Sequence, residues 1–476
     1  MKTLFIILFS SLIMIAQTKY PEINNAIAAG SFDEAKKLIE VKLNSGNLDD
    51  EEKYNLNFQI DKMERIKKDF NKTRDDIKKQ LSKYYTDLTD SMIDAWEKDN
   101  SLEMKMINSE KKYFRNAVPN LFRVNKEAQK IKQAVEGKTY HSKLNQFLSK
   151  HLPESVQKIS ESDLKIGNPV RIKINYTLTV DKNAVPAGET IRCWLPYPRE
   201  GHSRQTDIKL ISVNDDNYTI ADNEYPQRTL YMEKKAVADS STVFNMQLEY
   251  TAYSEWHNVN ADSLKPYRPA TDLYREYTSE RPPHIVFTDK IKALSEKIVG
   301  RELNPYKKLK LIYTWVDENI PWASAREYST IDSISNYCIN NMHGDCGIKT
   351  LLFITLCRYN GIPAKWQSGW MLHPGSVNLH DWSEVYLEEY GWVPVDQDYG
   401  IQESNDERVK YYYTNGIDSY RLIVNDDYSK PLYPPKKYPR SETIDFQRGE
   451  VEWDGGNLYF DKWDYNMEVE YQMLNQ

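Results

Sequence analysis

The chain has 476 residues, of which 40% are hydrophobic and 28% charged, and its formal net charge is -7. This length exceeds what one hydrophobic core usually serves, so we expect several structural units. The two fractions lie near the averages of globular proteins, which argues against a disordered chain and against a polytopic membrane protein. Basic and acidic residues are mixed along the sequence, so no nucleic-acid partner is indicated.

The N-terminus has the pattern of a secretory signal peptide. Lys2 is followed by an apolar run over residues 4–16, which is too short to span a bilayer. We therefore interpret residues 1–16 as a signal peptide and expect an exported protein, periplasmic or extracellular. An uncleaved anchor or a buried helix is the alternative interpretation. No later stretch approaches about 18 apolar residues, so no transmembrane helix is expected in the mature chain.

Residues 20–160 are predicted to form a helical region. Apolar residues recur there at helical spacing among charged ones, and Ile77, Leu81 and Leu88 would share one face of a long amphipathic helix. The charged faces of such helices are usually solvated. A docking surface for an unknown partner is the alternative interpretation of this region.

From about residue 165 the apolar period changes from helical to alternating, which predicts β-strands. Val170, Ile172 and Ile174 alternate with polar residues, and the pattern returns near Phe244. These strands predict a β-sandwich-like domain over residues 165–255.

Helix signals resume after an irregular connector and lead into the segment that carries the chemistry. We predict a core domain over residues 284–430 and a C-terminal β-rich extension over residues 431–476, so the whole chain is α+β and multidomain. The 34 tyrosines and 11 tryptophans are interpreted as filling β-rich cores. A glycan-binding role for these rings is the alternative.

The segment around Cys346 carries the strongest functional signal. Gly344 and Asp345 precede this cysteine, and an apolar helix pattern follows it to about Tyr359. We therefore expect Cys346 in the first turn of a helix, where unpaired backbone N–H groups and the helix dipole stabilise a thiolate. Gly344 would let backbone approach a substrate closely, and the amide of Cys346 could serve an oxyanion. A buried helix cysteine is the alternative.

A predicted β-hairpin supplies a base and a carboxylate. One strand begins at His380, the chain turns near Gly391, and the returning strand ends at Asp396. If Tyr386 pairs with Tyr390, His380 lies directly opposite Asp396, with Cβ atoms about 4.5–5.5 Å apart. A slip of one residue would place the two side chains on opposite faces of the sheet.

A cysteine at a helix start with a histidine and an aspartate on adjacent strands follows the logic of thiol proteases. The segment resembles the core of the transglutaminase-like superfamily. The motifs that carry this resemblance are Cys346, Arg358, Gly361-Ile362-Pro363-Ala364, His380-x-Trp382-x-Glu384-Val385 and Gly391-Trp392-Val393-x-Val395-Asp396. The resemblance covers about residues 286–428. It implies a papain-like α+β fold with Cys346 as nucleophile, His380 as base and Asp396 as the group that orients the histidine.

Other candidate site residues are assigned only from their positions. Trp322 and Asn336 are candidates for an oxyanion donor, because the family often carries a tryptophan or polar donor upstream of the cysteine. Trp366, Trp370 and His373 are candidates for the edge of the substrate cleft. The calcium-site patterns of animal cross-linking enzymes are not evident in the sequence, and we expect no cofactor.

The cysteines admit two further interpretations. They are Cys193, Cys338, Cys346 and Cys357, which are too few to imply a disulfide framework in an exported chain of this size. Cys338 and Cys346 could pair with each other or with Cys357. Cys338, Cys346, His343 and His373 could instead hold a metal, but their spacing matches no closed tetrahedral pattern, so no metal is expected.

These observations favour an exported thiol hydrolase that cleaves an amide bond through an acyl-enzyme at Cys346, most simply a peptidase. Transfer of the same acyl group to an amine would make a cross-linking acyltransferase, and a peptide N-glycanase is a further alternative. A noncatalytic surface protein that binds glycan or peptide is the alternative of another class. The expected substrate is a protein, a peptide or a glycopeptide.

Overall fold

The computed structural model describes residues 19–137, 143–161 and 164–474, so the expected signal peptide lies outside the described residues. The chain forms two compact units. Unit 1 comprises Met1–Tyr140, Glu280–Thr288 and Asn319–Ile348, and unit 2 comprises His141–Ser279, Asp289–Glu318 and Lys349–Gln476. The stretch that leads to Cys346 belongs to unit 1, although it follows the β-region in the sequence.

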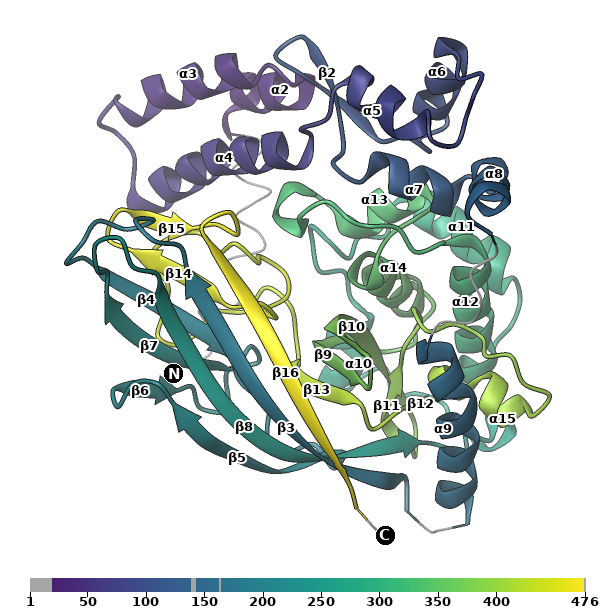
Figure 1. The fold of residues 1–476 in the computed structure, drawn as a ribbon. Helices are drawn as coiled ribbons and strands as arrows, with labels where there is room; N and C mark the ends of the chain where they lie inside the picture. The colour runs from purple at the N-terminus through teal and green to yellow at the C-terminus, as the bar shows by residue number, and fades with distance from the viewer. Residues whose placement is uncertain (1–18, 138–142, 162–163, 475–476) are drawn as a thin grey trace. The chain divides into compact units, whose positions relative to one another are not determined.

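Helices dominate the N-terminal part of unit 1 (Figure 1). They are α2 (Pro21–Ala29), α3 (Phe32–Leu43), α4 (Asp50–Asp69), α5 (Arg74–Leu81), α6 (Asp90–Lys98), α7 (Ala117–Val124) and α8 (Lys126–Glu136). The prediction of one long helix that includes Leu88 is wrong, because α5 ends at Leu81. Leu88 nevertheless packs against the same hydrophobic cluster as Ile77. Ile77, Leu81 and Leu88 therefore share a hydrophobic core, although they do not lie on one continuous helix.

A β-hairpin interrupts these helices. Strands β1 (Met104–Ile107) and β2 (Glu110–Tyr113) pair antiparallel. The turn residues Asn108 and Ser109 both have positive φ angles, 48° and 69°, as a two-residue hairpin turn requires. No local pattern indicates this hairpin, since β2 reads Glu-Lys-Lys-Tyr without an apolar alternation.

The N-terminal helices hold the later segments of unit 1 through polar contacts. The amide of Asn120 on α7 donates to the carbonyl of Ser324 and accepts from its N–H, both at 2.9 Å. Asp69 accepts a hydrogen bond from the N–H of Glu327 at 3.0 Å. The later segments contain η2 (Tyr328–Thr330), α13 (Ile334–Asn341) and the start of α14 (Cys346–Tyr359). The helical region is thus packed against the stretch that leads to the candidate nucleophile.

Unit 2 contains two five-stranded antiparallel sheets that share one hydrophobic core. Their strands from the predicted β-region are β3 (Ile166–Val180), β4 (Thr190–Pro196), β5 (Gln205–Val213), β6 (Tyr218–Ile220), β7 (Thr229–Lys235) and β8 (Thr242–Trp256). Cys193 on β4 is fully buried in this core, as expected for a small apolar side chain.

The C-terminal segment completes these two sheets and does not form a layer of its own. Strand β16 (Trp463–Met473) pairs along most of β3, and β14 (Glu450–Trp453) pairs with β4. β15 (Gly456–Leu458) and β12 (Gly416–Ile417) extend the edges of the two sheets. Such pairings join residues that are nearly 300 positions apart, as in the pair Val180 and Trp463. No local pattern in the sequence indicates them.

The second part of unit 2 is a four-stranded antiparallel sheet with flanking helices. The strand order is β11-β10-β9-β13, where β9 is Ala364–His373, β10 is Ser376–Leu387, β11 is Gly391–Val395 and β13 is Arg421–Asn425. The helices are α9 (Lys143–Ser160), α10 (Asp272–Thr278), α11 (Asp289–Val299), α12 (Pro305–Asn319) and α15 (Glu407–Lys410), with short 3-10 turns η1 (Ala261–Ser263) and η3 (Tyr412–Thr414).

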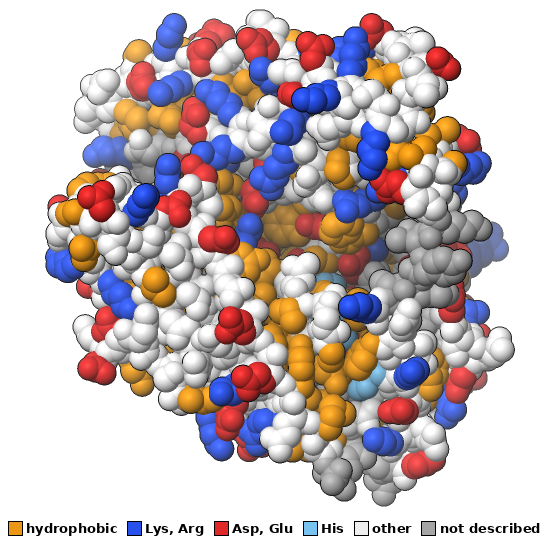
Figure 2. Space-filling model, in the orientation of Figure 1, with side chains coloured by type: hydrophobic (Ala, Val, Ile, Leu, Met, Phe, Trp, Pro, Cys, Tyr) orange, Lys and Arg blue, Asp and Glu red, His pale blue; other side chains and the backbone are white. Residues whose placement is uncertain are grey.

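Helix α14 runs from unit 1 into unit 2 and is mostly apolar, with a few polar side chains such as Lys349 and Arg358. Its side chains from Leu351 to Leu356 are fully buried, as expected for a helix inside a core. Across the described ranges, every helix is too short or too polar to traverse a lipid bilayer. On the face drawn in Figure 2, lysine and arginine side chains lie interspersed with aspartate and glutamate.

Candidate active site

Cys346 is the first residue of α14, as its sequence context predicted, and its side chain is partly exposed. The carboxylate of Asp345, just before the helix, accepts hydrogen bonds from the N–H of Ile348 at 3.2 Å and from the hydroxyl of Tyr328 at 2.7 Å. A carboxylate in this position caps the exposed N–H groups of a helix start. A Cβ at Gly344 would collide with the side chain of Ile348. Packing at the helix start therefore requires a glycine there.

Trp322 lies beside the loop that precedes Cys346. Residues Trp322 and Gly344 form a parallel β-bridge, and the N–H of Ala323 donates to the carbonyl of Gly344 at 3.0 Å. The indole is 43% exposed, and the guanidinium of Arg123 lies 4.5 Å from its ring centroid. The indole N–H is thus carried on a segment that is hydrogen-bonded to the loop of the candidate nucleophile.

Asn336 has a different environment. It lies on α13, where its amide donates to the hydroxyl of Ser333 at 3.0 Å and accepts from the hydroxyl of Thr288 at 3.2 Å. Both ends of the side chain are therefore engaged by neighbouring hydroxyl groups.

His380 and Asp396 are bonded to each other in unit 2. His380 is on β10, Asp396 directly follows β11, and the distance from His380 Nε2 to Asp396 Oδ2 is 2.8 Å. Both side chains are buried, with exposures of 2% and 0%. Since Nε2 is engaged by the carboxylate, Nδ1 is the ring nitrogen that remains to exchange a proton with a thiol.

The predicted register of this hairpin is wrong by two residues. Tyr386 pairs with Trp392 and not with Tyr390, because Leu387 and Gly391 close a three-residue turn. Glu389 and Gly391 have φ angles of 75° and 81°, so the turn needs left-handed backbone at two positions. A slip of two keeps every side chain on its predicted face. The histidine therefore meets the aspartate diagonally, within reach of such side chains.

Arg421 is a functional candidate that the sequence analysis missed. Its Nη2 lies 3.1 Å from Asp396 Oδ2, and its Nη1 lies 3.2 Å from Asp418, with all three side chains fully buried. Burial alone would raise the pKa of Asp396, but His380 and Arg421 together hold it below its usual value. Asp396 is therefore ionised. Arg421 is 25 residues from Asp396 in sequence, and no local motif marks it.

The first turns of α14 are fixed to the residues after Asp396. The ammonium of Lys349 lies 2.9 Å from Asp398, and the amide of Gln397 donates to the hydroxyl of Thr350. Lys349 and Thr350 follow Cys346 by three and four positions, and residues at these spacings share one face of a helix.

The three side chains expected at the edge of a cleft are buried. Trp366, Trp370 and His373 have exposures of 1%, 0% and 0%. The indole of Trp370 donates to the carbonyl of Gln447 at 2.8 Å, and His373 Nε2 lies 3.0 Å from Asp418. They belong to the core and to the ionic network around Asp418 and Asp396. The prediction of a cleft edge failed because an apolar strand pattern does not show whether other elements cover that face of the sheet.

None of the four cysteines, all of which are described, is in a disulfide. Cys193, Cys338 and Cys357 are fully buried, and burial raises the pKa of Cys193 and Cys357 well above the usual value. Cys346 differs from them in its partial exposure. Within the described residues, no group of three or more histidine, cysteine, aspartate or glutamate side chains is arranged to hold a metal.

Residues 292–397, which span Cys346, His380 and Asp396, match the family model of the transglutaminase-like superfamily. The chain therefore carries a transglutaminase-like core in this segment, as the motifs implied.

Two curated relatives match the chain. An uncharacterized protein of Haemophilus influenzae is 25% identical over 327 residues, which cover 60% of this chain and 86% of that protein. The protein YebA of Bacillus subtilis is 26% identical over 253 residues, which cover 49% of this chain but only 31% of YebA.

Two solved structures were also matched. A Cytophaga hutchinsonii protein described as a candidate cysteine protease has a TM-score of 0.41 and 18% identity, and the match covers 65% of this chain and 93% of that one. The periplasmic domain of TgpA from Pseudomonas aeruginosa has a TM-score of 0.25 and 12% identity, with coverages of 54% and 93%.

Proposed function

We propose that the chain is an exported thiol enzyme that hydrolyses an amide bond in a protein or peptide, with Cys346, His380 and Asp396 as its catalytic triad. The observation that carries the proposal is the buried pair of His380 and Asp396 at 2.8 Å, in the same segment as a partly exposed cysteine at a helix start. A histidine oriented by a carboxylate is the usual partner of a nucleophilic thiol.

The proposed chemistry is acyl transfer through the cysteine sulfur. Nδ1 of His380 takes the proton of the Cys346 thiol, and the sulfur attacks the carbonyl carbon of the scissile amide. The C–N bond breaks as His380 gives the proton to the leaving amine, which leaves a thioester. Water then attacks the thioester with His380 as base, and the carboxylic acid and the thiol are released. Asp396 holds the imidazole orientation and stabilises the imidazolium.

Helix geometry supports the placement of Cys346. Cys346, Lys349 and Thr350 share one face of α14, and the last two contact Asp398 and Gln397, which follow Asp396 directly. Along an α-helix each residue rises about 1.5 Å, so the Cα atom of Cys346 is about 4.5–6 Å along the axis from those of Lys349 and Thr350.

Trp322 is proposed as a donor to the oxyanion of the tetrahedral intermediate, together with the backbone N–H of Cys346. The first N–H groups of a helix have no partner within it, and preorganised donors at this place lower the barrier to acyl transfer. Support comes from the β-bridge between Trp322 and Gly344. Asn336 is a weaker candidate, since its amide is bonded to two hydroxyl groups.

The nucleophile is tested by alkylation across pH, with the modified cysteine mapped by mass spectrometry. Selective labelling of Cys346 near neutral pH, slowed by His380→Ala, supports the scheme. The matched control is His202→Ala, because His202 pairs with Asp426, well away from Asp396 in the sequence. Equal labelling of all four thiols, or equal effects of the two histidine variants, would contradict the scheme.

The reaction is tested with peptide substrates in the presence and absence of glycinamide. The proposed hydrolase releases free acid in both cases, whereas a cross-linking acyltransferase releases the glycinamide adduct. A protein with Cys346→Ala that retains full biological effect would instead indicate a noncatalytic binding role. Export is tested by the N-terminus of the mature protein, which we expect to follow residue 16.

A further inference from the structure

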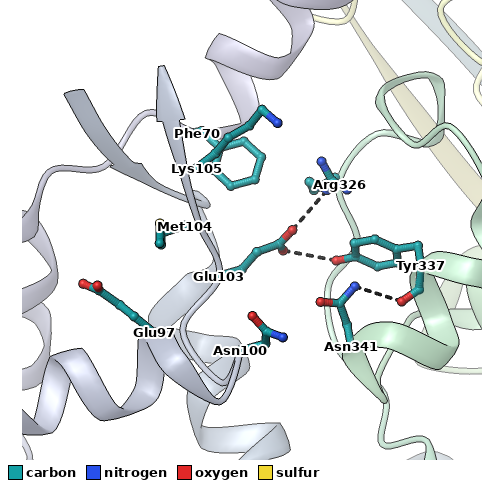
Figure 3. Close-up of a pocket in the computed structure, with 9 residues that line it drawn as sticks. All are labelled: Phe70, Glu97, Asn100, Glu103, Met104, Lys105, Arg326, Tyr337 and Asn341. Atoms are coloured by element: carbon teal, nitrogen blue, oxygen red, sulfur yellow. Dashed lines mark hydrogen bonds and ion pairs between the residues drawn. The ribbon is translucent and has the colours of Figure 1, made fainter. Parts of the chain in front are cut away.

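Unit 1 contains a polar cavity of about 230 Å³ that is separate from the triad residues. Nine residues line it, from the end of α4, α6, β1 and the approach to β1 on one side and from Arg326 and α13 on the other (Figure 3). The volume is smaller than the roughly 300–1,000 Å³ of pockets that enclose drug-sized ligands. It suits a ligand of the size of an amino acid or a short peptide end.

Two cations line the cavity, Lys105 and Arg326, and only Arg326 forms an ion pair with a carboxylate of the described residues. Arg326 Nε lies 3.1 Å from Glu103, which also accepts from the hydroxyl of Tyr337 at 3.2 Å. Within the described residues, Lys105 has no carboxylate within ion-pair distance. Burial and the charge of Arg326 lower the pKa of Lys105. An anion that enters the cavity would therefore relieve the repulsion between two cations.

The other acidic side chain of the lining, Glu97, is already neutralised. It bonds to Arg74 at 2.8 Å and to Lys111 at 2.6 Å, and Figure 3 shows its carboxylate turned away from Arg326. Glu97 therefore does not balance the charge of Lys105.

Two amide side chains face the same space. Asn341 donates to the carbonyl of Tyr337 at 2.8 Å, which leaves its Oδ1 as an acceptor. The side chain of Asn100 makes no hydrogen bond to any of the described residues, and in Figure 3 it extends toward Asn341. Carboxamides can donate and accept at once, so the pair matches a peptide group. The cavity thus offers cations for a carboxylate and amides for a peptide bond.

We propose that this cavity binds the C-terminal carboxylate and last peptide group of a short peptide, with the carboxylate at Lys105 and Arg326 and the peptide group at Asn100 and Asn341. The walls are completed by the ring of Phe70, which also lies 5.6 Å from the guanidinium of Arg326. Recognition of a chain end by a paired cation and amide set fits the size and charge of the cavity.

The site is built on the helix that leads to Cys346. Asn341 is the last residue of α13 and precedes Cys346 by five positions, so their Cα atoms are at most about 18 Å apart. The ring of Tyr337 meets the ring of His343 edge-on at 6.2 Å. A peptide end bound here would contact the same helix that positions the nucleophile's loop.

Binding is measured by calorimetry on the full chain with Cys346→Ser, which removes turnover and makes the result independent of the proposed triad. The ligands are L-Ala-L-Ala, its C-terminal amide and L-alanine. We expect the dipeptide acid to bind and the dipeptide amide to bind at least about tenfold more weakly, because the amide lacks the negative charge that strengthens hydrogen bonds from the two cations. Binding of L-alanine as tight as that of the dipeptide acid would overturn the peptide-group part of the proposal.

The key variant is Lys105→Met, which removes the cation that has no ion pair, whereas a change at Arg326 would leave the partly buried Glu103 without its ion-pair partner. The matched control is Lys112→Met, because Lys112 pairs with Lys105 across the hairpin but does not line the cavity. Lys105→Met should weaken the dipeptide acid about tenfold or more, and Lys112→Met should leave it close to the parent value. Equal binding of acid and amide, equal effects of the two variants, or no binding up to about 10 mM would overturn the proposal.

Discussion

The carboxylate of Asp396 provides the sharpest test of the proposed triad. Its Oδ2 accepts from His380 Nε2 at 2.8 Å and from Arg421 Nη2 at 3.1 Å, and the side chain is fully buried. Asp396→Asn keeps the size of the side chain and an oxygen acceptor for both donors, but it removes the negative charge. The variant therefore weakens the support of the imidazolium without opening a cavity.

The magnitude follows from the loss of charge in one hydrogen bond. A bond to a charged group contributes about 1.5–3 kcal/mol and a neutral one about 0.5–1.5 kcal/mol, so the imidazolium loses about 1–1.5 kcal/mol. The thiolate–imidazolium pair of Cys346 and His380 should then be about tenfold less populated relative to the neutral pair. At high pH the thiolate forms without help from the imidazolium, so the effect should vanish there.

The assay is the alkylation rate of Cys346 with iodoacetamide from about pH 5 to pH 10, the range over which histidine and thiol groups titrate. We expect Asp396→Asn to lower the rate about tenfold at pH 7 and to leave it unchanged at the top of the range. Asp418→Asn is the matched control, because Asp418 shares Arg421 with Asp396 but bonds to His373 and not to His380. A neutral-pH rate equal to that of the parent, or an equal loss at both pH extremes, would refute the reasoning.

Three further predictions concern unit 1. Burial raises the pKa of Asp69 to about 6, although Arg115 opposes the shift. The folded state therefore binds this proton more tightly than the unfolded state does. The free energy of unfolding should fall by about 3 kcal/mol as pH rises from about 4 to 6. Asp69→Asn should remove that slope in urea unfolding at several pH values. Trp322→Phe should lower kcat about 100-fold or more with alkylation of the thiol unchanged, whereas Asn336→Ala should spare kcat. Gly344→Ala should lower the unfolding free energy by about 1–3 kcal/mol through overpacking, measured by the denaturation midpoint.

Local patterns predicted the parts of the site that depend on neighbours in sequence. The start of α14 at Cys346 followed from the glycine and the apolar helix pattern around it, and the strands of His380 and Asp396 followed from their alternation. The register of that hairpin did not follow, since Glu389 takes a left-handed conformation that a glutamate rarely adopts.

Contacts between distant segments could not be predicted. Arg421 joins Asp396 only because β13 pairs with β9, and a charged residue in a strand gives no sign that it is buried. The pairing of β16 with β3 likewise depends on the whole sheet. Such contacts are specified by the complete core and not by any window of sequence.

The membership of Asn319–Ile348 in unit 1 bears on how the protein can be shortened. A fragment that begins at the first strand of the β-region would keep His380 and Asp396 but would lose Asn120, which holds Ser324 through two hydrogen bonds. The chain segment that leads to Cys346 would then lose the hydrogen bonds that hold it at Ser324. The helical region thus supports the loop that leads to the proposed nucleophile, so shortened variants and domain swaps should keep the two together.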